Sequence, residues 1–95
     1  SFKSLSKELE ISVGKLAKYN ERDKHERLIP GEYIWLKKKQ KKGPKEFKKR
    51  PYYVRKSESL YDIAQRYGIR LKSLVKKNEK IAERGLRIGD EVILY

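Results

Sequence analysis

The chain has no cysteine, no methionine, a single histidine and no long apolar run. Without cysteine it forms no disulfide, an absence that fits either redox compartment. His25 has no second histidine or cysteine with which to share a metal ion, so we expect no metal and no cofactor. No stretch approaches the roughly 18 consecutive apolar residues that span a membrane. Because no methionine and no signal peptide are present, we expect a fragment, or a processed form, of a longer protein.

Basic residues outnumber acidic ones by 26 to 13, and their excess is unevenly distributed. Residues 37–50 contain nine basic side chains and one acidic one. Such a block is typical of a solvated segment, and Gly43-Pro44 and Pro51 interrupt it further. We therefore expect a basic linker over residues 37–51. It acts as a spacer, as an electrostatic tether to anionic polymers or lipid headgroups, or as a nucleic-acid binder. Phe47 is its only aromatic residue, which disfavours the last role.

The chain contains an internal repeat. Residues 1–36 align with residues 59–94 without a gap, at an offset of 58. A repeat indicates two small folding units, and units of about 40–45 residues are marginally stable. Nine pairs are identical: Ser1/Ser59, Ile11/Ile69, Leu16/Leu74, Lys18/Lys76, Asn20/Asn78, Glu21/Glu79, Leu28/Leu86, Gly31/Gly89 and Leu36/Leu94.

The second copy has the pattern strand, helix, helix, strand. Residues 52–55 alternate like a strand, and the helix that follows begins at the cap Ser59 and ends at Gly68. Residues 71–78 predict a second helix, residues 79–85 a loop and residues 90–95 the last strand. The two strands should pair antiparallel under both helices, an α+β unit. The predicted core comprises Leu60, Ile63, Tyr67, Leu71, Leu74, Leu86, Val92 and Leu94.

The first copy lacks the first strand, because Ser1 corresponds to Ser59. Ser12 caps its second helix, and Glu10 stands where the second copy has Gly68. Its remaining strand, residues 32–36, has no partner, an exposed edge that favours pairing with another chain and hence a dimer. Tyr33 and Trp35 on this strand form either a sugar-stacking surface or a packing surface.

These residues resemble the LysM family. Residues 52–60 (YYVRKSESL) are similar to its opening Y-x-V-x-x-G-D-T-L, and Leu86-Arg87-Ile88-Gly89 to its L-x-x-G. Ile63-Ala64, Tyr67-Gly68-Ile69 and Leu74 with Asn78 continue the pattern, which covers about 80 residues over both copies. The resemblance implies two tandem βααβ units, repeat 1 at residues 1–36 and repeat 2 at residues 52–95. It also implies noncatalytic binding of N-acetylglucosamine polymers, peptidoglycan or chitin.

The family's groove lies between the loop before the first helix and the loop after the second. Ser57-Glu58 departs from the family's usual Gly-Asp at this place. The implied glycan-binding residues of repeat 2 are Ser57, Glu58, Ser59 and Leu60 on one wall and Lys80, Ile81, Ala82 and Glu83 on the other. In repeat 1 they include Arg22, Asp23, Lys24 and His25.

The resemblance implies a secreted, extracytoplasmic protein of the cell wall or periplasm, in which the repeats anchor an attached partner such as a cell-wall hydrolase. Two alternatives stay open: a basic module that binds nucleic acid or other anionic polymers, and a structural repeat that has lost sugar binding. His25 is a solvated loop residue or a ligand contact. Asn20 and Asn78 tie down the loops after their helices or contact sugar. We expect no catalytic residue, since no carboxylate is placed in a setting that would raise its pKa.

Overall fold

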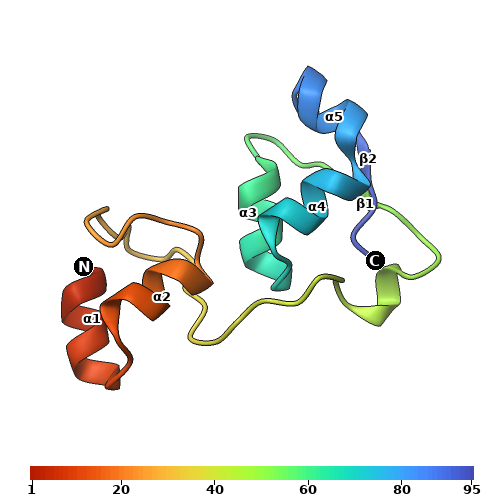
Figure 1. The fold of residues 1–95 in the computed structure, drawn as a ribbon. Helices are drawn as coiled ribbons and strands as arrows, with labels where there is room; N and C mark the ends of the chain where they lie inside the picture. The colour runs from red at the N-terminus through yellow and green to blue at the C-terminus, as the bar shows by residue number, and fades with distance from the viewer. The chain divides into compact units, whose positions relative to one another are not determined.

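A computed structural model describes all 95 residues, and its contacts divide the chain into two compact units, Ser1–Lys39 and Gln40–Tyr95. The first unit contains two helices, α1 (Phe2–Leu9) and α2 (Val13–Tyr19) (Figure 1). The elements of the second unit are η1 (Lys45–Phe47), β1 (Tyr52–Tyr53), α3 (Leu60–Tyr67), α4 (Leu71–Lys77), α5 (Glu79–Arg84) and β2 (Glu91–Val92). No helix of the chain is both long and apolar enough to cross a membrane.

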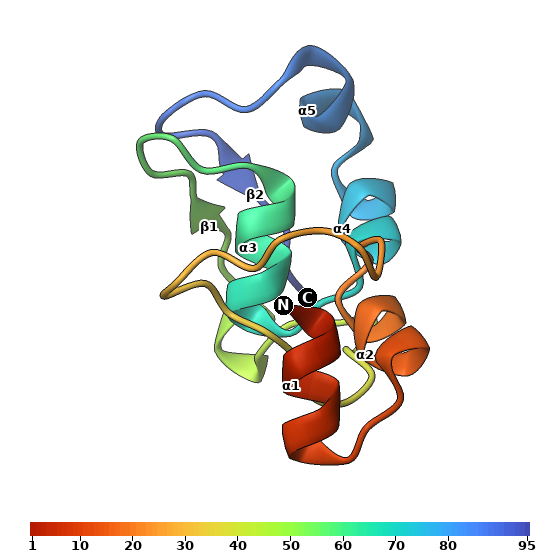
Figure 2. The same cartoon turned by 90° about the vertical axis from the view of Figure 1, so that its left-hand side faces the viewer.

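The second unit has the predicted α+β fold. Its strands β1 and β2 pair antiparallel, with Tyr52 opposite Val92. Figure 2 shows the helices α3 and α4 beside this small sheet. Ser59 caps α3 through a reciprocal capping box with Asp62, and Gly68 ends it with φ +69°. The βααβ order is therefore confirmed for this unit.

The core of the second unit lies between the sheet and the helices. Five of the eight predicted core residues are buried, while Tyr67, Leu71 and Leu86 are partly buried and pack against them. Burial at these positions is the main favourable contribution to folding in a unit of this size. The buried cluster consists of Tyr52, Val54, Leu60, Ile63, Ala64, Ile69, Leu74, Val92 and Leu94.

One prediction for this unit is wrong. Residues 79–85 do not form a loop throughout, because α5 occupies Glu79–Arg84. Its residues are mostly good helix formers, with an acid in the first turn and a base in the last. Gly85 ends the helix at φ +98°. The sequence is too short to show the helical period clearly, so tertiary contacts of Ala82 decide its conformation.

Asn78 connects the end of α4 to the strand that follows much later. Its side-chain amide donates to the carbonyl oxygens of Leu74 and Ile93, each at 2.9 Å, and its Oδ1 accepts from the Ile93 N–H at 2.8 Å. The side chain is buried. The prediction that Asn78 is a structural residue at a helix end is confirmed, but its side chain fixes Ile93, after β2, and not the segment directly after the helix.

The first unit contains the same connection at an offset of 58. Asn20 donates to the carbonyl oxygens of Leu16 (2.8 Å) and Trp35 (2.9 Å) and accepts from the Trp35 N–H (2.6 Å). The turn after it also repeats, because the carboxylate of Glu32 accepts from the Ile29 N–H as that of Asp90 does from the Arg87 N–H. Both units therefore share a hydrogen-bond pattern as well as a sequence pattern.

Most of the segment that we expected to be a linker belongs to the second unit. Gln40 forms a parallel bridge with Ile69, donating to the Gly68 oxygen and accepting from the Arg70 N–H at 2.8 Å each. The Gly43 N–H donates to the Leu94 oxygen at 2.7 Å. Beyond them, Phe47 packs edge-on against Tyr52 and Tyr67. The lysines between these anchors are exposed. The basic composition therefore predicted correctly that the side chains are solvated, but it did not predict that the backbone packs against the second unit.

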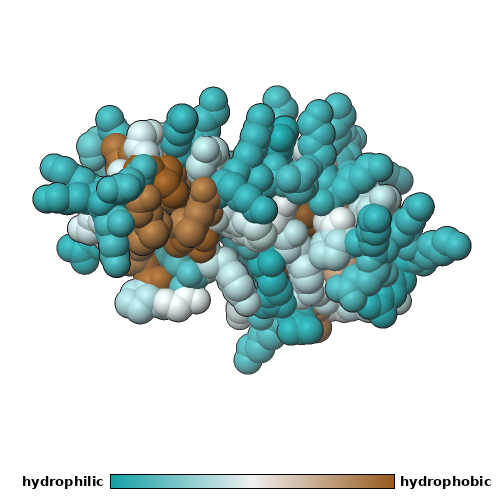
Figure 3. All heavy atoms as spheres, turned by 90° about the horizontal axis from the view of Figure 1, so that it is seen from below, coloured by the Kyte–Doolittle hydropathy of each residue, from teal (hydrophilic) through white to brown (hydrophobic).

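The first unit has no assigned strand, and its apolar surface is less covered. Leu36 is 47% exposed, whereas its counterpart Leu94 is fully buried. Figure 3 shows hydrophobic residues gathered on the face of the first unit, while the second unit is mostly hydrophilic in that view. Strand pairing with another chain through residues 32–36 stays a prediction.

Replacing Asn78 with Ala should lower the free energy of unfolding of the second unit by about 2–4 kcal/mol, since it leaves backbone groups of Ile93 and Leu74 without partners. Urea unfolding followed through the amide resonances of residues 52–94 measures this change. The exposed neighbour Lys76→Ala is the control and should change stability little. A parent-like Asn78→Ala variant would contradict the role given to this amide.

Gly43 is needed because the chain passes directly over the core. An added Cβ would lie 2.9 Å from Ile69 Cδ1 and 3.0 Å from the Leu94 oxygen. Gly43→Ala should therefore destabilise the second unit by about 1–3 kcal/mol. Gly14→Ala, in open space within α2, should instead leave the first unit unchanged or stabilise it by up to about 1 kcal/mol. Equal effects of the two substitutions on thermal unfolding would show that segment 40–51 does not pack as described.

Candidate functional site

The turn between β1 and α3 forms the first predicted wall of the site, and a buried ionic network fixes it. Both oxygens of the Glu58 carboxylate accept from the Tyr52 hydroxyl, at 2.7 and 2.8 Å, and one accepts from the Arg55 N–H at 2.7 Å. Arg66 lies 3.3 Å from the same carboxylate and 3.2 Å from the Tyr52 hydroxyl. The Glu58 side chain is only 8% exposed, so it shapes the turn and is not directed at a ligand.

Within this wall, Lys56 and Ser57 keep their main-chain groups open. No hydrogen bond inside the chain engages them, and both residues are exposed. Ser57 has φ +62°, a left-handed conformation that favours glycine. Ser57 therefore holds a backbone conformation that glycine adopts without strain. The neighbouring Ser59 and Leu60 begin α3, Ser59 as its cap and Leu60 as a buried core residue.

The second predicted wall is the helix α5 rather than a loop. Lys80 and Glu83 are exposed, whereas Ile81 and Ala82 are partly buried. The Ala82 N–H donates to the Asn78 oxygen at 2.9 Å. Within the helix the Ala82 N–H is therefore not open to a ligand, and the exposed part of Ile81 remains as an apolar contact.

The two walls lie at the same end of the second unit in Figures 1 and 2. A hollow of about 450 Å³ lies where the end of α4, the start of α5 and the sheet meet. It is lined by Pro51, Lys76, Lys77, Asn78, Glu79, Lys80, Ile81, Glu91 and Ile93. None of residues 57–60 lines it. Lys80 and Ile81 therefore line one hollow, whereas the first wall is an exposed turn outside it. The two predicted walls do not enclose a common pocket.

The corresponding residues of the first unit have structural contacts of their own. Arg22 pairs with Glu26 at 2.8 Å and with Glu32, and its guanidinium lies 5.5 Å from the Phe2 ring centre. The hydrogen bond from Arg22 lowers the pKa of Glu26. Arg22 therefore holds its loop together.

The other three predicted residues of this loop are exposed. Asp23 accepts from the His25 N–H at 2.8 Å, and Lys24 and His25 face solvent. No group of three or more histidine, cysteine or acidic side chains is arranged to hold a metal ion.

Asp90 and Glu32, which the sequence analysis did not name as site residues, occupy aligned positions in the two units and stabilise the turn in each. Asp90 accepts from the Arg87 N–H at 2.8 Å and pairs with Arg84 at 2.9 Å, and these bonds lower its pKa. Its counterpart Glu32 pairs with Arg22 in the first unit. Both residues directly follow an aligned glycine, Gly31 or Gly89, and an acidic residue repeated at this position could have identified them from the sequence.

Residues 52–94 match the family model described as LysM domain. Over these residues the second unit is therefore similar to the LysM domain, a family whose members generally bind N-acetylglucosamine glycans such as peptidoglycan and chitin. Comparison with curated proteins and with solved structures found no match.

The Tyr52 hydroxyl should make the second unit sensitive to alkali. Burial, and then the hydrogen bond to Glu58, raise the pKa of Tyr52 to about 12. Because this pKa is higher in the folded state, its stabilising effect is complete below pH 10 and is lost as the pH rises toward 12, by up to about 2–3 kcal/mol. Alkaline unfolding followed by circular dichroism tests this. Tyr52→Phe should remove the dependence and Tyr53→Phe, an exposed ring, should retain it; the reverse result would contradict the network.

Proposed function

We propose that the second unit binds N-acetylglucosamine-containing glycans without catalysis, through the turn at residues 56–60 and the neighbouring surface of α5. The match of residues 52–94 to the LysM family is the observation that carries this proposal. The open main-chain groups of Lys56 and Ser57 support it, because a neutral acetamido group is recognised by N–H and C=O groups. Ile81 offers the apolar contact for its methyl group.

We further propose that residues 1–36 are a second LysM copy without its first strand. The gapless alignment and the shared asparagine connection support this. Two weak sites on one chain would gain avidity on a repeating polymer. In this proposal the repeats hold an attached protein, such as a cell-wall hydrolase, at an extracytoplasmic wall. The exposed Lys24 and His25 would then be the residues of repeat 1 that are open to a glycan.

Chitin oligomers titrated into the chain should perturb the amide resonances of residues 56–60 and 80–83 before those of residues 40–45. Ser57→Pro should weaken binding about tenfold or more, since proline removes the N–H and cannot adopt a positive φ. Ser57→Gly retains both features and should bind like the parent.

Unfolding curves of both variants establish that the fold is intact. As a second test, Ile81→Ala should weaken binding, whereas Ile88→Ala at the 71% exposed Ile88 should not. The absence of any perturbation with the parent chain would favour a structural repeat that has lost sugar binding.

A further inference from the structure

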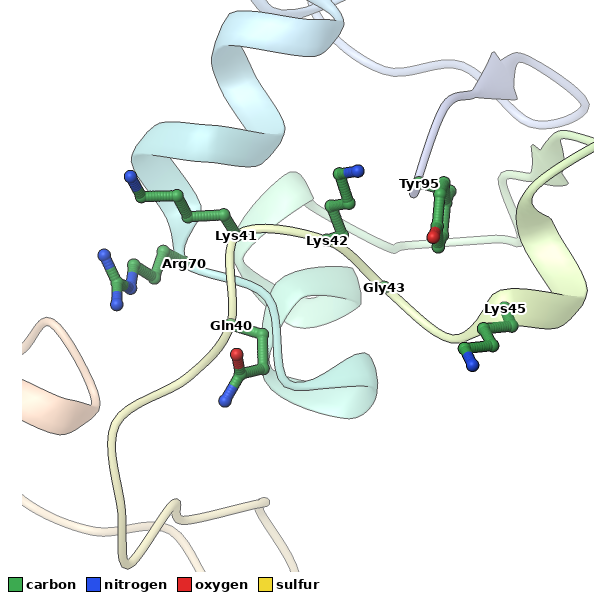
Figure 4. Close-up of a pocket in the computed structure, with 7 residues that line it drawn as sticks. All are labelled: Gln40, Lys41, Lys42, Gly43, Lys45, Arg70 and Tyr95. Carbon is green, nitrogen blue, oxygen red and sulfur yellow. The ribbon is translucent and has the colours of Figure 1, made fainter.

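The second unit has a basic face formed by residues 40–45, Arg70 and the helix α4. Two open hollows, of about 420 and 550 Å³, share Lys41, Lys42 and Arg70 in their linings. Figure 4 shows Lys41 and Arg70 extending to the same side and Lys42 next to Tyr95. The cationic side chains of this basic face are Lys41, Lys42, Lys45, Arg70, Lys72, Lys76 and Lys77.

Backbone hydrogen bonds hold the two segments of the basic face together. The Gln40 main chain donates to the Gly68 oxygen and accepts from the Arg70 N–H, the two residues on either side of Ile69. The Lys77 ammonium donates to the Lys41 carbonyl oxygen at 2.7 Å. The Gly43 N–H anchors the segment to Leu94. The lysines of residues 40–45 are therefore fixed beside those of α4, which a free linker would not achieve.

The six lysines of the basic face have no acidic side chain beside them in its two hollows. No side chain that lines either hollow carries a carboxylate. None of its six lysines forms an ion pair. Burial, and then the charge of Lys42, lower the pKa of Lys77. Like charges gathered in this way repel one another, and a bound polyanion would relieve that repulsion.

The aromatic rings near the basic face are already engaged. Phe47 packs against Tyr52 and Tyr67, and the Tyr95 ring lies 4.8 Å from the Lys42 ammonium and 5.9 Å from that of Lys48. Single-stranded nucleic acid is typically bound by free aromatic rings that stack on bases. No exposed large hydrophobic residue lines the hollows, as insertion into a lipid surface would require.

We propose that this basic face binds a linear polyanion that carries phosphate or carboxylate groups. Lysine ammonium groups attract such anions as point charges, without the planar geometry of an arginine pair. None of residues 57–60 or 80–83 lines the two hollows of the basic face, but Lys76 and Lys77 also line the hollow that contains Lys80 and Ile81. Anion binding and glycan binding are therefore tested separately with lysines that lie outside this third hollow.

The experiment compares two variants of equal net charge. One replaces the exposed Lys41, Lys45 and Lys72 by Gln on the basic face, and the other replaces the exposed Lys3, Lys7 and Lys15 of the first unit by Gln. Binding of long-chain inorganic polyphosphate and of polygalacturonate is measured by fluorescence anisotropy at several salt concentrations. Thermal unfolding verifies that both variants are folded.

The basic-face variant should lose about tenfold or more in affinity, and its plot of log affinity against log salt should be shallower by about 2, as the loss of three charge contacts implies. The first-unit variant should bind like the parent. A preference for polyphosphate or for polygalacturonate would identify phosphate or carboxylate as the recognised group.

Equal losses in both variants would overturn the proposal, because net charge alone would then explain binding. Tighter binding of single-stranded DNA than of polyphosphate at equal salt would also overturn it, as would binding to anionic lipid vesicles with no binding to either polymer. Chitin binding serves as the separate readout: its loss with polyanion binding retained would refute the proposed function but not this inference.

Discussion

The side-chain amide of Asn78 is the interaction on which the second unit depends most. Each strand of the sheet is only two residues long, so the ladder between β1 and β2 contributes few hydrogen bonds. The amide adds three more, all buried or partly buried, and joins α4 directly to the last strand. In the first unit, where no strand is assigned, Asn20 makes the same three bonds and holds Trp35 against α2. A small unit with few core residues needs such connections, because hydrophobic burial alone leaves it marginal.

A comparison of the aligned residues Leu36 and Leu94 shows what segment 40–51 contributes to the second unit. Leu94 is fully buried because the backbone at Gly43 passes over it, whereas Leu36 remains 47% exposed. The segment completes the core of the second unit with its backbone and with Phe47, and its lysines extend into solvent. Segment 40–51 therefore stabilises the core through its backbone and Phe47 and also supplies exposed positive charges through its lysines.

The two proposals assign neutral and charged recognition to different parts of the second unit. At the turn before α3, the charges of Glu58 and Arg66 are used within the protein, where they fix the backbone of Lys56 and Ser57. A fixed turn loses little conformational entropy on binding, which helps a weak contact to a neutral sugar. On the basic face the backbone is used for packing, and the ammonium groups of the exposed Lys41, Lys45 and Lys72 extend into solvent. The division follows from chemistry: acetamido groups need directed hydrogen bonds, and polyanions need only charge density.

The sequence by itself determined the repeat, the order of elements in the second unit, most of its core and the capping of α3, because these follow from local periodicity and from caps a few residues apart. Tertiary structure decided the rest. Helix α5 depends on the packing of Ala82, and Glu58 became a structural residue through Tyr52 and Arg66, which lie on other elements. The basic run of residues 37–50 predicted a free linker, because its composition indicates that the side chains are solvated. Whether the backbone between those lysines packs depends on hydrogen bonds to Gly68, Arg70 and Leu94, distant in sequence, which no local pattern encodes.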